Sequence, residues 1–148
     1  MLFVSLTYIP KYTKNSRLMQ EIRTKRHVVY SLHLHLVFVT KYRKKVFTEM
    51  MFERLHVHFE RVCGDFGCNL IETNGQKDHV HLLIEPLPHT NPSRLVNSLK
   101  GVSSRFMRKE FPELEKYYWK GGLWSPSYFI ASCGGAPLDI VKKYIQKQ

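Results

Sequence analysis

The chain has 148 residues, of which 43% are hydrophobic, and this is enough for one compact domain with its own core. Such a composition argues against disorder, and no apolar run approaches the roughly 20 residues of a membrane-spanning helix. The net charge of +11 and the pI of about 9.7 predict a polyanionic partner, most often a nucleic acid. A membrane surface would require a basic amphipathic helix that the sequence does not show convincingly. The alternative to a polyanionic partner is that the excess positive charge serves only solubility.

The cysteines and the start of the chain indicate the compartment. Cys63, Cys68 and Cys133 are odd in number and lack CxxC spacing, which argues against a disulfide framework or a zinc ribbon. They are typical of buried thiols in a reducing environment. The first residues lack the basic segment and the cleavage site of a signal peptide, so we expect a cytoplasmic protein.

Residues 1–26 differ in composition from the rest. They hold a basic run without a hydrophobic pattern, and we interpret them as a loose, solvated arm, with phosphate contact as the alternative role. Met19 is a candidate natural start, which would make residues 1–18 foreign to the native protein. We expect residues 27–148 to form a single domain.

The first half of this domain predicts two strands and a helix. Residues 27–40 alternate between apolar and polar side chains, as in a long strand with one apolar face. A basic loop follows at 41–45, and Thr48 can cap a helix whose apolar residues recur at spacings of three and four. Residues 68–73 predict a second strand, and Asn74-Gly75 is a strong signal for a hairpin turn.

The second half predicts a strand, a helix, more strands and a final helix. The strand after the hairpin carries two histidines, and Asn91-Pro92 opens a second helix. The aromatic run at 117–133 predicts one or two strands, and Pro137 begins a last short helix. This order predicts an α+β fold of the ferredoxin-like plan, also used by RNA-recognition modules. It has an antiparallel sheet with helices on one face, plus an appended C-terminal helix.

His79 and His81 are the candidate metal ligands. Residues i and i+2 of a strand point to the same face, so the two imidazoles would lie side by side. Two neutral imidazoles on a rigid strand can form half of a metal site. An ordinary polar strand face has the same pattern and is the alternative.

Two further His-x-His pairs compete with this one. His33 and His35 share a strand face, and the first and third strands of the predicted plan are neighbours, so these histidines could flank the site as a second layer. His56 and His58 lie in the first predicted helix, where residues i and i+2 do not share a face. We therefore expect His56 and His58 on the surface.

The last predicted helix strengthens the interpretation of His79 and His81 as metal ligands. Tyr144 and Gln148 are spaced i and i+4 and therefore share one helix face. A tyrosine can supply a hydroxyl nucleophile, and a glutamine can supply an oxygen ligand. Lys143 and Lys147 would favour a phosphate and a tyrosinate nearby. A tyrosine that only packs against the domain is the alternative.

Five motifs follow one another along the chain. They are Tyr30-x-Leu32-His33-x-His35-Leu36-Val37-Phe38-Val39-Thr40-Lys41-Tyr42-Arg43, Asp78-His79-Val80-His81, Leu99-Lys100-Gly101-x-Ser103-Ser104-Arg105, Leu123-Trp124-Ser125-Pro126-Ser127-Tyr128-Phe129 and Lys143-Tyr144-Ile145-x-x-Gln148. In this order they resemble a known family, the HUH-type single-tyrosine transposases of small bacterial insertion sequences, also called IS200-like. The resemblance covers about residues 27–148.

The resemblance implies an enzyme that cleaves and rejoins single-stranded DNA at hairpin-bearing ends. It implies Mg²⁺ or Mn²⁺ bound by His79, His81 and Gln148, and Tyr144 as the nucleophile that forms a 5′-phosphotyrosine. It also implies a homodimer in which the tyrosine helix of one subunit completes the site of the other, an exchange that Gly134-Gly135 would permit. Gln148 is the last residue of the sequence, where fraying would weaken a rigid ligand.

Contacts with DNA are expected from basic residues more than from aromatic ones, because most of the aromatic run would pack in the core. The candidates for phosphate contact are Lys41, Arg43, Lys44, Lys100 and Arg105. The alternatives are a non-catalytic binder of single-stranded nucleic acid with the same fold, a domesticated relative, or a decayed copy. A plasmid-type replication initiator shares the histidine chemistry but usually has a larger chain.

Overall fold

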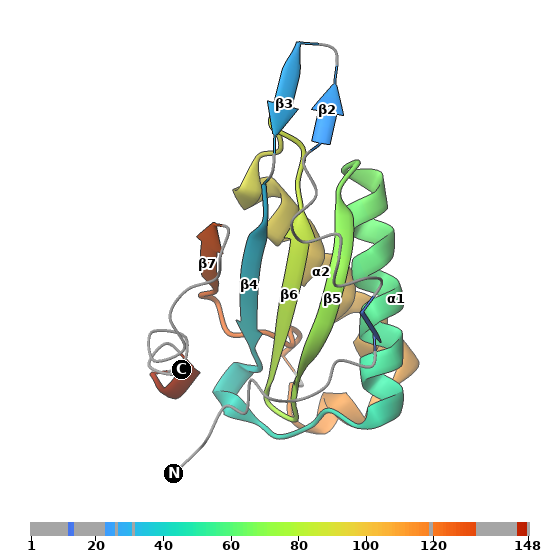
Figure 1. Cartoon of the computed structure of the whole chain (residues 1–148). Coiled ribbons are helices and arrows are strands. Elements are labelled where there is room, and N and C mark those ends of the chain that lie inside the picture. Colours follow the sequence, from blue (N-terminus) through green and yellow to red (C-terminus); the bar gives the residue numbers. More distant parts are fainter. Residues whose placement is uncertain are drawn as a thin grey trace.

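The computed structural model describes residues 12–13, 23–25, 27–30, 32–118, 120–132 and 145–147. Most of the described chain forms two α-helices and a central antiparallel sheet (Figure 1). The elements are β1 (Tyr12–Thr13), β2 (Arg23–Lys25), β3 (Val28–Tyr30), β4 (Leu34–Val39), a 3-10 turn (Lys41–Arg43), α1 (Glu49–Asp65), β5 (Asn69–Gln76), β6 (His79–Glu85), α2 (Pro92–Glu110), a second 3-10 turn (Pro112–Lys116) and β7 (Phe129–Ser132).

The central sheet has the strand order β1-β5-β6-β4-β7, and β2 pairs with β3 in a separate small sheet. Both helices cover the same face of the central sheet, behind it in Figure 1. Without the short β1, the order is that of the ferredoxin-like plan, in which the first and third strands lie side by side. The predicted α+β fold is therefore confirmed.

Both helices begin where the sequence predicts a cap. The Thr48 hydroxyl accepts a hydrogen bond from the Met51 amide at 3.2 Å, and the Asn91 side chain accepts one from the Arg94 amide at 3.2 Å. Pro92 occupies the first turn of α2, where its missing N–H costs nothing. These caps fix the start of each helix and hence which face it turns toward the sheet.

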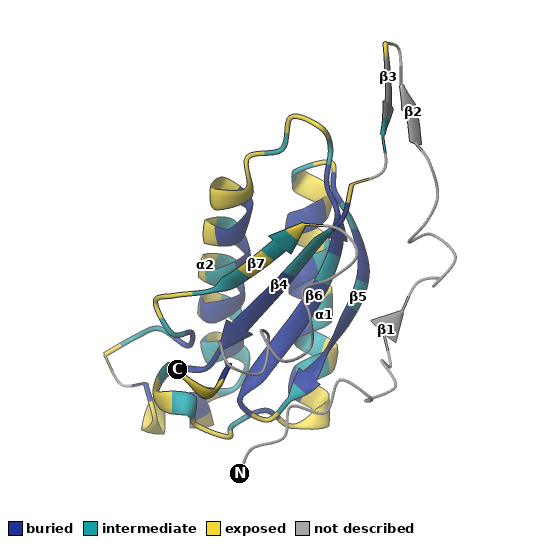
Figure 2. Ribbon diagram, turned by 60° about the vertical axis from the view of Figure 1, so that its left-hand side comes forward, coloured by how far each residue is buried: buried dark blue, intermediate teal, exposed yellow. Residues whose placement is uncertain are grey.

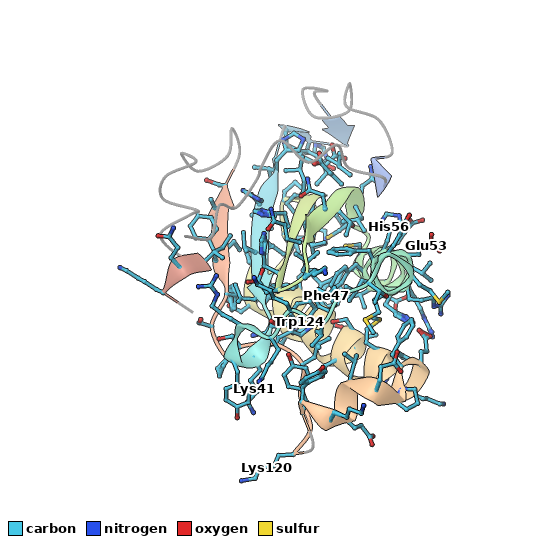
Figure 3. The ribbon with its side chains drawn as sticks, turned by 90° about the horizontal axis from the view of Figure 1, so that it is seen from below. Lys41, Phe47, Glu53, His56, Lys120 and Trp124 are labelled. Atoms are coloured by element: carbon cyan, nitrogen blue, oxygen red, sulfur yellow. The ribbon has the colours of Figure 1, made fainter. Side chains whose placement is uncertain are left out.

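The core lies between the helices and the sheet. In Figure 2, the buried strands and the inner helix faces form one continuous layer. Phe38 and Phe59 are fully buried there, and Trp124 packs against both rings. Figure 3 shows Phe47 beside Trp124, with 5.4 Å between the ring centroids. The same core includes Val80 and Leu82 of β6, so the helices cover one face of both β4 and β6.

The predicted hairpin turn is three residues too early. Asn74 and Gly75 lie inside β5, and the turn is formed by Lys77 and Asp78. Tertiary contacts explain this, because the Thr40 amide donates to the Asp78 carbonyl and the Val46 and Phe47 amides donate to the Lys77 carbonyl. These bonds outweigh the local preference of Asn-Gly for a turn.

Two further predictions about strands need correction. The long strand expected over residues 27–40 is divided into β3 and β4, and β3 pairs with β2 outside the central sheet. Two pieces of the segment expected to be a loose arm are strands, since β1 pairs with β5 and β2 with β3. Within the described part of the chain, no helix is long and apolar enough to cross a membrane.

Candidate metal centre

His79 and His81 lie on β6, between β5 and β4. Val80 and Leu82 of this strand belong to the core beneath the helices, so alternation places both histidines on the opposite face. His79 is 1% exposed and His81 is 5% exposed. The predicted side-by-side arrangement is confirmed, with 5.1 Å between the two ring centroids.

The Asp78 carboxylate determines how the ring of His79 is oriented and that Nδ1 carries a hydrogen. The Asp78 Oδ1 atom lies 2.8 Å from His79 Nδ1, and because a carboxylate can only accept, this nitrogen carries the hydrogen. The lone pair of the neutral ring is then on Nε2. Burial acts to raise the pKa of the Asp78 carboxyl, but hydrogen bonding from His79 and the Arg43 charge outweigh it, so the pKa is lowered.

His35 supports His81 in a comparable way. The His35 Nε2 and His81 Nδ1 atoms lie 3.1 Å apart, and the two rings are stacked. Burial lowers the pKa of His35, and burial followed by the neighbouring histidines lowers the pKa of His81 well below its ordinary value. Both shifts favour the neutral form of the ring. His33, the other predicted flanking residue, is also buried.

The Nε2 atoms of His79 and His81 are of a kind that could bind a divalent cation. Among the residues that the structure describes, neither His79 Nε2 nor His81 Nε2 has a hydrogen-bond partner, although both atoms are buried. Two unpaired imidazole nitrogens on one strand face can bind a metal ion. The described ranges contain no group of three His, Cys, Asp or Glu side chains that could hold one. The other predicted ligand, Gln148, and the predicted nucleophile, Tyr144, lie outside the described residues.

Arg43 connects the histidine strand to the C-terminal segment. Its guanidinium donates to Asp78 Oδ2 at 3.4 Å and to the Gln146 carbonyl at 3.5 Å. Tyr42 and Arg43 both have positive φ, which turns the chain sharply beside the Asp78 turn. Residues 145–147 therefore lie next to the Asp78–His79 pair. This role of Asp78 has no local sign in the sequence, which predicted a phosphate contact for Arg43.

Exposed aromatic rings stand next to the basic loop. Tyr42 is 71% exposed and has the Lys41 ammonium 5.5 Å from its ring centroid. Tyr117 is 45% exposed and has the Lys44 ammonium 5.9 Å from its centroid. The labelled Lys41 side chain extends away from the body of the protein in Figure 3. Tyr118 and Trp124 of the aromatic run are buried, as expected for core residues.

The two predicted phosphate contacts on α2 have different surroundings. The Lys100 ammonium donates to the carbonyls of Ser125, Pro126 and Ser127, at 2.8, 3.0 and 3.5 Å. Burial lowers its pKa, and the side chain ties α2 to the loop that follows Trp124. Arg105 is exposed and stacks on Phe106. Lys100 is thus occupied by internal hydrogen bonds.

His58 contradicts the expectation that it lies on the surface. It is buried, and its Nε2 lies 2.8 Å from Glu110 Oε1 of α2. Arg54 binds the same carboxylate through two nitrogens, at 3.0 and 2.9 Å. His56 is half-buried and lies 3.1 Å from the Thr73 hydroxyl. A partner on α2, far away in sequence, makes the burial of His58 favourable.

Known proteins resemble this chain in sequence. The family of IS200-like transposases matches residues 28–148. The chain is 33% identical to the ISDra2 transposase TnpA of Deinococcus radiodurans, over 86% of this chain and 91% of that one. It is 26% identical to the transposase for insertion sequence element IS200 of Salmonella typhimurium, over 82% and 80% of the two chains.

Solved structures of other proteins resemble this chain in fold. A crystal structure of a proposed transposase from Deinococcus radiodurans R1 matches with a TM-score of 0.78 and 32% identity, over 85% of this chain and 97% of that one. A REP-associated tyrosine transposase bound to a REP hairpin matches with a TM-score of 0.52 and 9% identity, over 83% and 67% of the chains. At this identity the second structure supports the fold alone.

Proposed function

Because this chain belongs to the family of IS200-like transposases, we propose that it cleaves and rejoins single-stranded DNA through a covalent tyrosine intermediate. The observation that carries the proposal is the pair of buried nitrogens, His79 Nε2 and His81 Nε2, each without a hydrogen-bond partner among the described residues. A buried polar atom left unpaired is costly, and such atoms commonly serve a ligand.

These nitrogens would hold Mg²⁺ or Mn²⁺, with Gln148 as a proposed oxygen ligand. When bound, the ion would supply Lewis-acid polarisation of the scissile phosphate. Asp78 and His35 keep the two rings oriented by bonding the Nδ1 atoms. The neutral ligand set leaves the charge of the ion unreduced.

Tyr144 is the proposed nucleophile. Its hydroxyl oxygen would form a bond to the scissile phosphorus, and the bond from phosphorus to the 3′ oxygen would break, leaving a 5′-phosphotyrosine and a free 3′-OH. Tyrosine has a pKa near 10, so its proton must be removed with the help of a nearby positive charge or base. Placement of residues 145–147 beside Arg43 supports this assignment, because they directly follow Tyr144.

The DNA partner is proposed to be a single strand with hairpin ends. Tyr42 and Tyr117 are exposed and accompanied by Lys41 and Lys44, an arrangement that suits stacked bases and a phosphate backbone. Arg105 adds an exposed charge on α2. A homodimer with exchanged tyrosine helices is part of the same proposal.

The test is a denaturing gel of the full chain with labelled single-stranded DNA that carries the hairpin ends of the element. Samples contain Mn²⁺ or EDTA, and the variants are Tyr144→Phe and Tyr128→Phe, the second as a matched control. We expect an adduct that requires Mn²⁺, disappears in Tyr144→Phe and persists in Tyr128→Phe. Tight binding without any adduct would instead favour a non-catalytic binder of single-stranded nucleic acid.

A further inference from the structure

We propose that Asn74 of β5 provides an oxygen ligand, through its Oδ1 atom, for the cation held by His79 and His81. This inference rests on the proposed function and adds to its metal site a further residue, on a neighbouring strand. The grounds are the strand register, the orientation of the Asn74 amide, and the unpaired state of its oxygen.

The register places Asn74 directly opposite His81. In the β5–β6 pair, Asn74 faces His81 and Gln76 faces His79. Opposed residues of an antiparallel pair point to the same face, with Cβ atoms about 4.5–5.5 Å apart. Asn74 therefore shares the face of the sheet that carries the two histidines, and it stands beside His81.

Glu72 determines which atom of the Asn74 amide points away. The Asn74 Nδ2 atom lies 2.7 Å from Glu72 Oε1. A carboxylate can only accept hydrogen bonds, so the atom next to it must be the NH₂ group. The amide oxygen then lies on the side of the group that faces away from Glu72. Two residues further along the same face is Gln76, opposite His79.

The Asn74 oxygen is buried and unpaired. Asn74 is 9% exposed, and Oδ1 has no hydrogen-bond partner in the portion of the chain that the structure describes. The same holds for His79 Nε2 and His81 Nε2, so three unpaired polar atoms come from two adjacent strands. Unpaired buried polar atoms are rare in folded proteins, and three such atoms on one face of two paired strands support a shared ligand.

The chemistry of these atoms suits a hard divalent cation. Mg²⁺ and Mn²⁺ prefer oxygen ligands, and a site of two imidazoles alone would suit zinc equally well. An amide oxygen adds a hard, neutral ligand on a rigid strand. Asn74 would thus shift the preference of the site toward Mg²⁺ and Mn²⁺ without adding charge.

The test measures Mn²⁺ binding to the full chain, without DNA, from the loss of the electron paramagnetic resonance signal of free Mn²⁺. The variants are Asn74→Ala, His81→Ala and Asn69→Ala, the last being a matched control at the other end of β5, where it faces Glu85. We expect Asn74→Ala to weaken binding by about tenfold or more, and Asn69→Ala to leave it unchanged.

A double variant separates a ligand role from a structural one. Asn74→Asp combined with Glu72→Gln preserves the amide–carboxylate hydrogen bond and the net charge, but it turns a carboxylate toward the histidines. We expect it to bind Mn²⁺ more tightly than the natural protein does. If Asn74 only stabilised β5, this exchange would not raise the affinity.

The outcomes distinguish this inference from the proposed function. Loss of Mn²⁺ binding in His81→Ala together with unchanged binding in a folded Asn74→Ala would overturn the role of Asn74 alone. Unchanged Mn²⁺ binding in His81→Ala would overturn the histidine site itself, and the inference with it.

Discussion

The Asp78 carboxylate and the ring of His79, which are neighbours in sequence, are joined by a hydrogen bond of 2.8 Å between Oδ1 and Nδ1. This bond leaves Nε2 as the nitrogen with the free lone pair. The Arg43 guanidinium, 3.4 Å from the other carboxylate oxygen, holds the carboxylate in turn. The orientation of the proposed ligand therefore depends on a residue in the loop after β4.

Asp78→Asn should weaken Mn²⁺ binding by about ten- to a hundredfold. The amide keeps the size of the side chain, but it loses the charge and can donate to Nδ1, which favours the wrong tautomer of His79. Calorimetric titration with Mn²⁺ measures the change. Asp65→Asn, at the end of α1, is the matched control. Equal affinity in both variants would rule out an orienting role for Asp78.

Arg43→Ala should lower the free energy of unfolding by about 1–3 kcal/mol, because a buried carboxylate loses its charged partner. Lys45→Ala, an exposed residue of the same loop, should change it by less than about 0.5 kcal/mol. Urea unfolding of the two variants measures both values. Equal effects would mean that the bonds of Arg43 to Asp78 and Gln146 contribute little.

Gly75→Ala should destabilise the protein by about 1–3 kcal/mol through overpacking. A Cβ atom on Gly75 would collide with the His79 carbonyl oxygen and would lie 2.8 Å from the Val80 Cα atom, and backbone cannot easily move away. Gly101→Ala in α2, where a Cβ atom meets nothing within 4 Å, should instead stabilise by about 0.5–1 kcal/mol. Thermal unfolding shows whether each substitution lowers or raises the stability of the protein.

Glu110 should make the stability depend on pH in the acid range. The hydrogen bond from Arg54, together with His58, lowers the pKa of the Glu110 carboxyl to about 2, whereas partial burial acts in the opposite direction. A lowered pKa in the folded state contributes stability above the ordinary value of 4.5, and this contribution is lost as the pH falls toward about 2. The difference in unfolding free energy between the natural protein and Glu110→Gln should therefore shrink below about pH 4.5.

The control for this prediction is Glu53→Gln, an exposed glutamate on α1 that Figure 3 labels. Its difference from the natural protein should stay small across the same range. The prediction would be contradicted if the difference in unfolding free energy between the natural protein and Glu110→Gln stayed constant between about pH 6 and pH 3.

Tyr42→Ala and Tyr117→Ala should each weaken binding of single-stranded DNA by about 1–3 kcal/mol, the usual contribution of one stacked base. Met50→Ala, an exposed apolar residue on α1, is the control and should leave the affinity unchanged. Fluorescence anisotropy with a labelled oligonucleotide measures the affinities. A loss as large in Met50→Ala would indicate a general effect on folding.

Local patterns in the sequence predict most of the fold. The two-residue period of β6 placed His79 and His81 on one face correctly, and the caps at Thr48 and Asn91 placed both helices. The order of strands and helices then leads to neighbouring first and third strands, and so to the contact between His35 and His81.

The errors arise where distant parts of the chain decide the local structure. The hairpin turn predicted at Asn74-Gly75 was wrong because backbone amides in residues 40–47 donate hydrogen bonds to the carbonyls of the observed turn. His58 was expected at the surface because its partner Glu110 is 52 positions away. The bonds of Lys100 and Arg43 were missed for the same reason, since a basic residue gives no local sign of an internal acceptor.

The position of β6 within the sheet has a consequence for local opening. This strand has hydrogen-bonded neighbours on both sides, whereas β7 lies at an edge. The backbone amides of central strands usually exchange with deuterium only when the whole domain unfolds, while edge strands exchange through small local fluctuations. We therefore expect the two histidines to belong to the slowest-exchanging unit, and their spacing to persist when either edge of the sheet opens.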